Sequence, residues 1–527
     1  MGWIRFSLVA IAIVVGIGCG SGSEDSQSQT LVIGRASDAI ALDPARVTDS
    51  ESVEICNQIF ESLLRFKPGT NTVEASLAES WGVSPDGKVW DFALRHGVAF
   101  HDGTLLNADA VVFSFLRQFD ENHPYHLVDT TGGSFAWGAT YNNIVSVKAT
   151  GEYSLQIVIG RPFAPFAANL AMFPVSIVSP TAIKKWGEEF DRHPVGTGPF
   201  VFSVWSEGRI VLERNASYWG DKPKIRRLVF KEISDARERL TALESGAVHL
   251  AYSILPDDQQ FVSLHPQLQL YRAGSNNVAY LAINTTHPPF DDVRVRRALN
   301  YAINKEPILK LAYQGMALVA DGALPPSQWG YISKSFPYEY DLESARRIID
   351  EVILEGNVDF KDPIQFFVPA TPRAYLPDPA MVAKIIKANL ESLGLTVNLV
   401  TQEFSEHLKS IRSGEHDVSL IGWVGDNGDP DNYLYVLFDQ DNAQPGAARN
   451  LAFLRDDTVH SMLLEARKVN VQAARSAIYA KAQKRIGSLA PWVPLVHSQT
   501  VVVANTRVAE VTFSTSGHVL FSRVELR

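Results

Sequence analysis

The spacing of apolar residues divides the first half of the chain into short predicted strands and helices. Apolar residues at alternate positions predict strands, and apolar residues at three- and four-residue spacing predict helices. On this basis we expect strands at residues 31–36 and 89–95, helices at 52–66, 107–119 and 235–248, and a hairpin over 144–159. Turns rich in Gly, Pro and Asp separate these elements, as at SPDG (84–87) and HDGT (101–104).

The second half has a different pattern, in which longer helices alternate with strands. A long amphipathic helical region is predicted for residues 291–315, followed by helices at 341–356, 379–394 and 404–416 and by strands at 364–370, 395–402 and 417–423. This alternation indicates a largely parallel sheet that is covered by helices. The apolar segment TVVVAN, residues 500–505, then returns to the strand pattern of the first half.

Composition and charge narrow the class of protein. The 527 residues are enough for about three to four domains. With 46% hydrophobic and 20% charged residues, the composition is typical of a soluble globular protein. The net charge of −10 and the lack of any run of basic residues argue against a nucleic-acid partner, because phosphate binding needs a basic face.

The N-terminus predicts export. Residues 1–18 are expected to be a signal peptide, because Arg5 precedes an apolar segment that is too short to span a bilayer. The next residue, Cys19, resembles the lipidated Cys of the bacterial lipobox, although Gly16 stands where that box usually has Leu. Residues 19–29 would then be a lipid anchor with a flexible tether, and the alternative is a plain secretory signal. Cys56 is expected in the core.

An acidic loop, GWVGDNGDPDNYL (422–434), carries the most suggestive chemistry. It could serve a metal, an enzyme or a cationic ligand. Calcium is disfavoured, because Gly428 and Pro430 occupy positions 3 and 5 of a loop that starts with Asp426 as position 1, where an EF-hand needs oxygen ligands. No G-x-S-x-G, P-loop or HExxH motif is present, and the 13 His are scattered. We therefore expect a binding protein with no catalytic residues, no resident metal and no cofactor.

Several long segments resemble the family-5 extracellular solute-binding proteins of ABC transporters, and the resemblance covers about residues 30–527. The segments are 76–115, 194–200, 215–230 and 290–309, and three more are most similar to the dipeptide-binding subclass: 325–331, 369–379 and 406–434. The resemblance implies an α/β fold of the large three-domain type, with two lobes about a hinge. Lobe one would comprise residues 30–60, 197–278 and 496–527, with an extra domain at 61–196, and lobe two would be an insert at 279–495.

The site follows from the chemistry of a short peptide, which is a zwitterion. Burying its ammonium and carboxylate is costly unless each is paired. The resemblance implies that Asp426 binds the ammonium and that Arg373 binds the carboxylate, with Tyr375 nearby. Arg373 follows the predicted strand 364–370, and open α/β sheets bind ligands at the carboxyl ends of strands. Its planar guanidinium can pair with both carboxylate oxygens. Asp429 and Asp431 are expected to shape and cap the loop.

Other residues are weaker candidates for the site. Gly422 and Gly425 would let the backbone approach the ligand. Trp423 and Trp329 are expected either to cover an apolar ligand side chain or to belong to the core. Ser134, in TGGSFAWG (131–138), would reach the cleft from the extra domain.

The resemblance implies an extracytoplasmic, membrane-anchored or periplasmic protein that captures a dipeptide or short peptide and delivers it to an ABC permease. A monomer is expected. The alternative ligands are an oligopeptide, a glutathione-like peptide, haem or a nickel complex. A sensory role is the other alternative to uptake.

Overall fold

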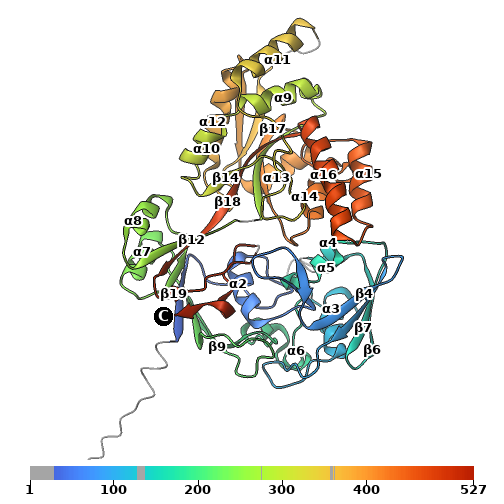
Figure 1. Cartoon of the computed structure of the whole chain (residues 1–527), viewed down its shortest axis with the longest axis vertical. Helices are drawn as coiled ribbons and strands as arrows, with labels where there is room; N and C mark the ends of the chain where they lie inside the picture. Colours follow the sequence, from blue (N-terminus) through green and yellow to red (C-terminus); the bar gives the residue numbers. More distant parts are fainter. Residues whose placement is uncertain (1–28, 128–136, 275, 357–359, 361, 515) are drawn as a thin grey trace, which may run out of the picture.

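Strand β18 (Trp492–Asn505) connects two bodies of the molecule, because its two ends belong to different parts of one sheet (Figure 1). Its first half pairs with β13 (Asn277–Ile283) and β14 (Ala317–Val319), and its second half pairs with β11 (Leu250–Tyr252) and β12 (Leu268–Gly274). The computed structural model describes residues 29–527 apart from 128–136, 275, 357–359, 361 and 515. The short step from β12 to β13 is the other crossing between the bodies, so two adjacent segments form the hinge.

Lobe two is the upper body in Figure 1, and its sheet is mixed rather than largely parallel. The strands β16 (Val397–Gln402), β15 (Ile364–Pro369) and β17 (Val418–Val424) run parallel to one another. The prediction is wrong for β13, β14 and β18, which pair in antiparallel fashion. The physical reason is the topology of the hinge: β13 enters lobe two and β18 leaves it, so the two strands run in opposite directions.

Helices cover both faces of this sheet, as predicted. Alternate residues of the buried strand β13 point to opposite faces, so that Leu281 lies in one core and Tyr280 in the other. The helices on the Leu281 side are α9 (Val293–Ala302), α10 (Lys305–Leu311), α11 (Leu342–Leu354) and α12 (Pro379–Glu391). Those that pack on the Tyr280 side are α13 (Phe404–Ser413), α14 (Asp431–Phe438), α15 (Asp457–Ala466) and α16 (Gln472–Leu489), with the short η4 (Gln440–Asn442) after α14.

The lower body contains lobe one and a smaller sheet. The lobe-one sheet continues from β18 through β11 to β1 (Thr30–Arg35), β10 (Arg227–Glu232), β9 (Arg209–Arg214) and β8 (Phe200–Ser206). Its helices and short pieces are α2 (Ser50–Ile59), α7 (Ala236–Glu244), η3 (Pro256–Asp258), α8 (Gln259–Leu264), β19 (Val508–Ala509), η5 (Phe521–Arg523) and β20 (Glu525–Leu526).

The smaller sheet has its own core and lies within the predicted extra domain, a name we keep for it. Its strand order is β4 (Ala78–Val83), β5 (Val89–Leu94), β7 (Ser154–Ile159) and β6 (Ile144–Gly151), and α3 (Ala108–Phe119) contributes to its core. The remaining elements are β2 (Leu64–Phe66), β3 (Val73–Ala75), α4 (Gly138–Tyr141), α5 (Phe166–Asn169), η1 (Phe173–Val175), α6 (Pro180–Trp186) and η2 (Gly187–Arg192). The residue limits that the sequence predicts for the two lobes and the extra domain stay a prediction.

Two predicted helices are shorter than expected. The helix predicted for 52–66 ends at Ile59, because tertiary contacts hold the following residues in an extended chain. The Ile59 carbonyl accepts a hydrogen bond from the Gly198 N–H, and the half-buried Glu61 carboxylate accepts one from Thr197. The region 291–315 is two helices, α9 and α10, and Asn304 caps the second by accepting from the N–H of Glu306.

Among the described helices, none has both the length and the apolar character needed to cross a bilayer.

Candidate functional site

The two predicted charged residues leave the same edge of the lobe-two sheet. Arg373 follows β15, and Asp426 follows β17. These strands are parallel neighbours, with Phe366 opposite Val418, so their carboxyl ends lie at one edge. This confirms the predicted position of Arg373 at the end of a strand, which is where ligands bind in open α/β sheets.

The Arg373 guanidinium stacks on an aromatic ring and has no ion-pair partner among the described residues. It lies over the Phe404 ring, with 3.4 Å from the guanidinium carbon to the ring centre, and the side chain is half-buried. Its Nε is buried without a hydrogen-bond partner, and Arg373 forms no ion pair with any described residue. A tight backbone turn fixes the position of the residue, because Arg373 and Leu376 exchange hydrogen bonds of 2.9 and 2.8 Å. Stacking of this kind leaves the edge of the guanidinium free to meet a planar anion.

The Asp426 carboxylate is also without an ion-pair partner in the described part of the chain. The residue is exposed, yet desolvation raises its pKa to about 6, and the Asn432 amide contact and the more distant charge of Arg449 oppose that shift only in part. The two findings would conflict on a convex surface. They agree if the carboxylate lies on a concave wall, where solvent reaches it from one side and protein surrounds it on the others. Asn432 holds this region together: its Oδ1 accepts from the Asp426 N–H at 3.1 Å and from the Trp423 indole at 2.9 Å.

The other two acidic residues of the loop were predicted to shape and cap it, and the structure shows them buried and paired with arginines. Asp429 accepts two hydrogen bonds of 2.7 Å from Arg475 and one of 3.0 Å from the Asp431 N–H. Asp431 is the first residue of α14, and its carboxylate lies 3.3 Å from the Arg467 guanidinium. Desolvation raises the pKa of the Asp431 carboxyl to about 6. Both residues therefore anchor the loop.

The loop glycines are closely packed against tyrosines, and their predicted role in admitting a ligand stays a prediction. A Cβ atom on Gly422 would lie 2.2 Å from the Tyr375 ring, and one on Gly425 would lie 2.5 Å from the Tyr433 hydroxyl. The space beside each glycine is therefore filled by a buried tyrosine and not held open for a ligand. Tyr375 itself is 8% exposed and belongs to the core beneath the edge.

The tryptophans and the two remaining candidates have separate positions. Trp423 is partly buried beside Asp426, with the shared partner Asn432. Trp329 lies partly buried against the lobe-two core, with the Arg475 guanidinium 5.0 Å above its ring. Ser134 and Cys19 lie outside the described residues.

Sequence reasoning missed two groups at this edge. Phe404, which stacks on Arg373, follows β16 directly and so leaves the same edge as Arg373. That placement after a predicted strand could have identified it. Asn432 lies six residues beyond Asp426 at the start of α14, and nothing in its spacing marks it as the partner of two loop groups.

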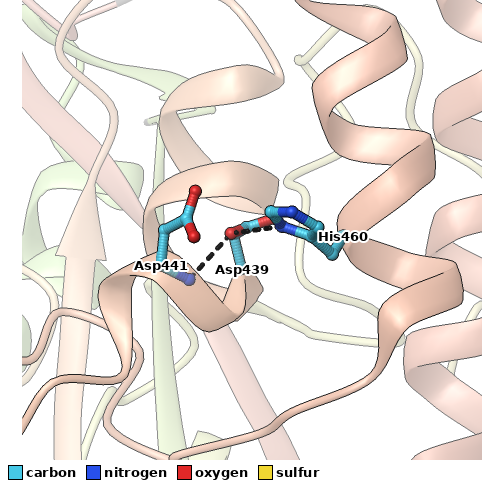
Figure 2. A group of neighbouring side chains, drawn as sticks. All are labelled: Asp439, Asp441 and His460. Carbon is cyan, nitrogen blue, oxygen red and sulfur yellow. Dashed lines mark hydrogen bonds and ion pairs between the residues drawn. The ribbon is translucent and has the colours of Figure 1, made fainter.

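One cluster in the described residues could offer ligands to a metal: Asp439, Asp441 and His460, whose ligand atoms lie within 4.8 Å of one another (Figure 2). Asp439 is buried, and its carboxylate already accepts from the Asp441 N–H at 2.9 Å and lies 3.0 Å from His460 Nδ1. These contacts cap the short helix η4 and pair the two side chains. The cluster lies after the C-terminal end of α14, whereas Asp426 precedes that helix.

Comparisons with known proteins agree with this architecture. The family model described as "Bacterial extracellular solute-binding proteins, family 5 Middle" matches residues 72–445. Heme-binding protein A of Haemophilus influenzae is 33% identical, over 94% of this chain and 92% of its own. The dipeptide-binding protein of Escherichia coli is 36% identical, over 85% of each chain. The solved structure of HbpA2 from Haemophilus parasuis superposes with a TM-score of 0.89 at 32% identity, over 94% of this chain and 100% of that one.

Proposed function

The chain belongs to the family-5 bacterial extracellular solute-binding proteins, and from this premise we propose that it binds a short peptide between its lobes for an ABC importer. Its relatives are binding proteins and not enzymes. The peptide ammonium would pair with Asp426 and the peptide carboxylate with Arg373. The complex would then deliver the peptide to a permease in the membrane.

The observation that carries the proposal is a pair of opposite charges at one sheet edge that lack ion-pair partners among the described residues. Arg373 has a buried Nε without a hydrogen bond, and Asp426 has a raised pKa. Within the part of the chain that the structure describes, neither group has an ion-pair partner, whereas the neighbouring loop carboxylates Asp429 and Asp431 do. Leaving charges partly desolvated costs free energy, which a ligand carrying the opposite charges would recover. A zwitterionic peptide has that pattern.

A two-point clamp would recognise the ends of the peptide and tolerate its side chains. Water can bridge polar groups with little loss of free energy, so a hydrated pocket can accommodate varied side chains.

Lobe closure would be favoured by contacts of the ligand with both lobes. Cys19, if lipidated, would keep the protein, which we expect to be a monomer, near the permease at the outer face of the membrane. A sensory role would use the same closed form.

Titration calorimetry with four ligands tests the proposal: a dipeptide, its N-acetylated form, its C-terminal amide and a tripeptide. Each blocked dipeptide is expected to bind more weakly by about 2–5 kcal/mol, the range for leaving a buried charge without its partner. Equal affinity for the free and blocked dipeptides would refute the two-point clamp. The tripeptide reports how strictly the clamp measures ligand length.

Haem is the second candidate ligand, because a relative that aligns with 94% of this chain is named a heme-binding protein. A haemin titration followed by visible absorption tests it in parallel. Saturable spectral change without any heat from peptides would favour haem. Heat from peptides, with no saturable change on addition of haemin, would favour the peptide.

A further inference from the structure

We propose that Asn169 of the extra domain is a positioning residue for Asp426, so that the ammonium site is assembled by two domains and not by lobe two alone. The inference rests on the proposed function, because it concerns the residue that we expect to bind the peptide ammonium. It follows from two contacts that the acidic loop makes with the extra domain.

The first contact joins Asn427 to Asn169. The Asn427 Nδ2 donates to the Asn169 Oδ1 at 2.6 Å, and both side chains are buried, with 5% and 2% exposure. The Asn427 Oδ1 accepts from the Asp429 N–H at 3.0 Å. The amide of Asn427 therefore bridges the extra domain and its own loop, one residue after Asp426.

Asn169 is itself held rigidly at the C-terminal end of α5. Its carbonyl accepts from the Tyr141 hydroxyl at 2.8 Å, and its Nδ2 donates to the Thr140 carbonyl at 3.3 Å. The residue therefore offers a fixed acceptor at the surface where the loop arrives. Burial raises the pKa of Tyr141, and the negative charge of Asp426 raises it further, which places the carboxylate in the neighbourhood of this helix end.

The second contact fixes the next residue of the loop. Gly428 adopts a positive φ of 62°, and a Cβ atom there would lie 2.7 Å from the Asn71 Oδ1, so the loop backbone lies directly on this side chain. Asn71 donates to Gln328 at 3.0 Å, and Gln328 donates to the Gly428 carbonyl. Asn169 thus bonds directly to the loop at Asn427, and Asn71 packs against the next residue, Gly428, and reaches its carbonyl through Gln328.

The side chain of Asp426 has little to hold it apart from this backbone. Its one hydrogen-bond contact in the described residues is with the Asn432 Nδ2, at 3.5 Å. The direction of the carboxylate is therefore set by the loop, which the Arg475 pair holds from lobe two and the Asn169 bond holds from the extra domain. Opening between the two domains would break the Asn427–Asn169 bond and release Asp426 from its ligand-binding position.

A double-mutant cycle tests this role with the full-length mature protein. Calorimetry with a free dipeptide is carried out on the wild type, Asn169→Ala, Asp426→Asn and the double variant. Loss of one buried hydrogen bond predicts that Asn169→Ala weakens binding about 5- to 10-fold. In the Asp426→Asn background the same change is expected to weaken binding less than about 2-fold, because the group that it positions is already lost.

Three outcomes would contradict the inference, and they separate it from the proposed function. Equal weakening by Asn169→Ala in both backgrounds would mean that Asn169 supports closure in general. An unchanged affinity of Asn169→Ala would mean that it positions nothing. Wild-type affinity of Asp426→Asn would refute the ammonium role itself, and the inference with it.

Two further variants control for damage to the fold. Asn427→Ala removes the same hydrogen bond from the lobe-two side, so it should reproduce the weakening, and adding Asn169→Ala to it should add little. Asn122→Ala, at an exposed asparagine of the extra domain, should bind as the wild type does. Thermal unfolding of each variant shows that the compared proteins are folded.

Discussion

The Asp429 carboxylate accepts two hydrogen bonds of 2.7 Å from the Arg475 guanidinium, and both side chains are buried. This bidentate pair anchors the acidic loop to α16, although the two residues are 46 positions apart in the sequence. Asp426 lies three residues earlier in the same loop and has no such partner in the described residues. One loop therefore contains a carboxylate in a buried ion pair and another that we propose as the partner of a ligand ammonium.

The Asp429–Arg475 pair predicts a large effect on stability. Asp429→Asn leaves the buried guanidinium without its counter-charge, which is expected to lower the free energy of unfolding by about 3–5 kcal/mol. Urea unfolding followed by circular dichroism measures the loss. Asp350→Asn, at an exposed carboxylate on α11, should change stability by less than about 0.5 kcal/mol. Similar small changes in both variants would show that the pair does not anchor the loop.

The division of roles among the aspartates could be anticipated from the sequence, but its cause could not. Motif resemblance separated Asp426 from Asp429 and Asp431, and the strand pattern placed Arg373 at a strand end. The identity of the partner, Arg475, depends on how α16 packs against the loop, which local spacing does not encode. The same limit applied to α2, whose end is set by contacts with residues more than a hundred positions later.

The loop glycines show a second limit of sequence reasoning. Gly422 could be expected to bring the backbone close to a ligand, since glycine permits close approach. The structure shows that the Tyr375 ring occupies the space beside it. Tyr375 lies in a separate segment and is brought there by the pairing of β15 with β17. A need for glycine could be predicted, but the neighbour that requires it could not.

Gly422→Ala tests that packing role. The new methyl group would lie 2.2 Å from the Tyr375 ring and 2.6 Å from the Val278 carbonyl, so we expect a loss of about 1–3 kcal/mol in unfolding free energy. Gly82→Ala is the matched control, because a Cβ atom there meets nothing within 4 Å. Unchanged stability with weakened peptide binding in Gly422→Ala would instead favour the ligand-approach role.

Arg373→Ala is expected to weaken binding of a free dipeptide by about 2–5 kcal/mol, since it removes the partner of the buried peptide carboxylate. The C-terminal amide of the same dipeptide should lose much less, because it has no carboxylate to pair. Calorimetry with both ligands measures the difference. Arg347→Ala, at an exposed arginine on α11, should leave both affinities unchanged. An equal loss for the two ligands would place Arg373 outside the carboxylate subsite.

Asp426→Asn is the corresponding test at the other terminus. It preserves the size of the side chain and removes its charge, so we expect a loss of about 2–5 kcal/mol for a free dipeptide. The N-acetylated dipeptide, which has no ammonium, should bind both proteins with similar weak affinity. A loss below about 0.5 kcal/mol for the free dipeptide would exclude the ammonium role.

The affinity for a dipeptide should depend on pH through Asp426. In the ligand-free protein the pKa of this carboxyl is raised from 3.8 to about 6 by desolvation, and a bound ammonium favours the ionised form, which lowers the pKa in the complex. Affinity is therefore full above about pH 7 and falls as the pH decreases through about 6, by at most about tenfold per pH unit.

Calorimetry between pH 5 and pH 7.5 measures this slope, in a range where the peptide ammonium stays mostly protonated, since its usual pKa is about 8. Repeating the titrations in buffers with different ionisation enthalpies counts the protons released on binding. In Asp426→Asn the acidic decline should disappear, because the titrating group is gone. If the decline persists unchanged in that variant, another group controls it, and the free carboxylate of the loop does not meet the peptide ammonium.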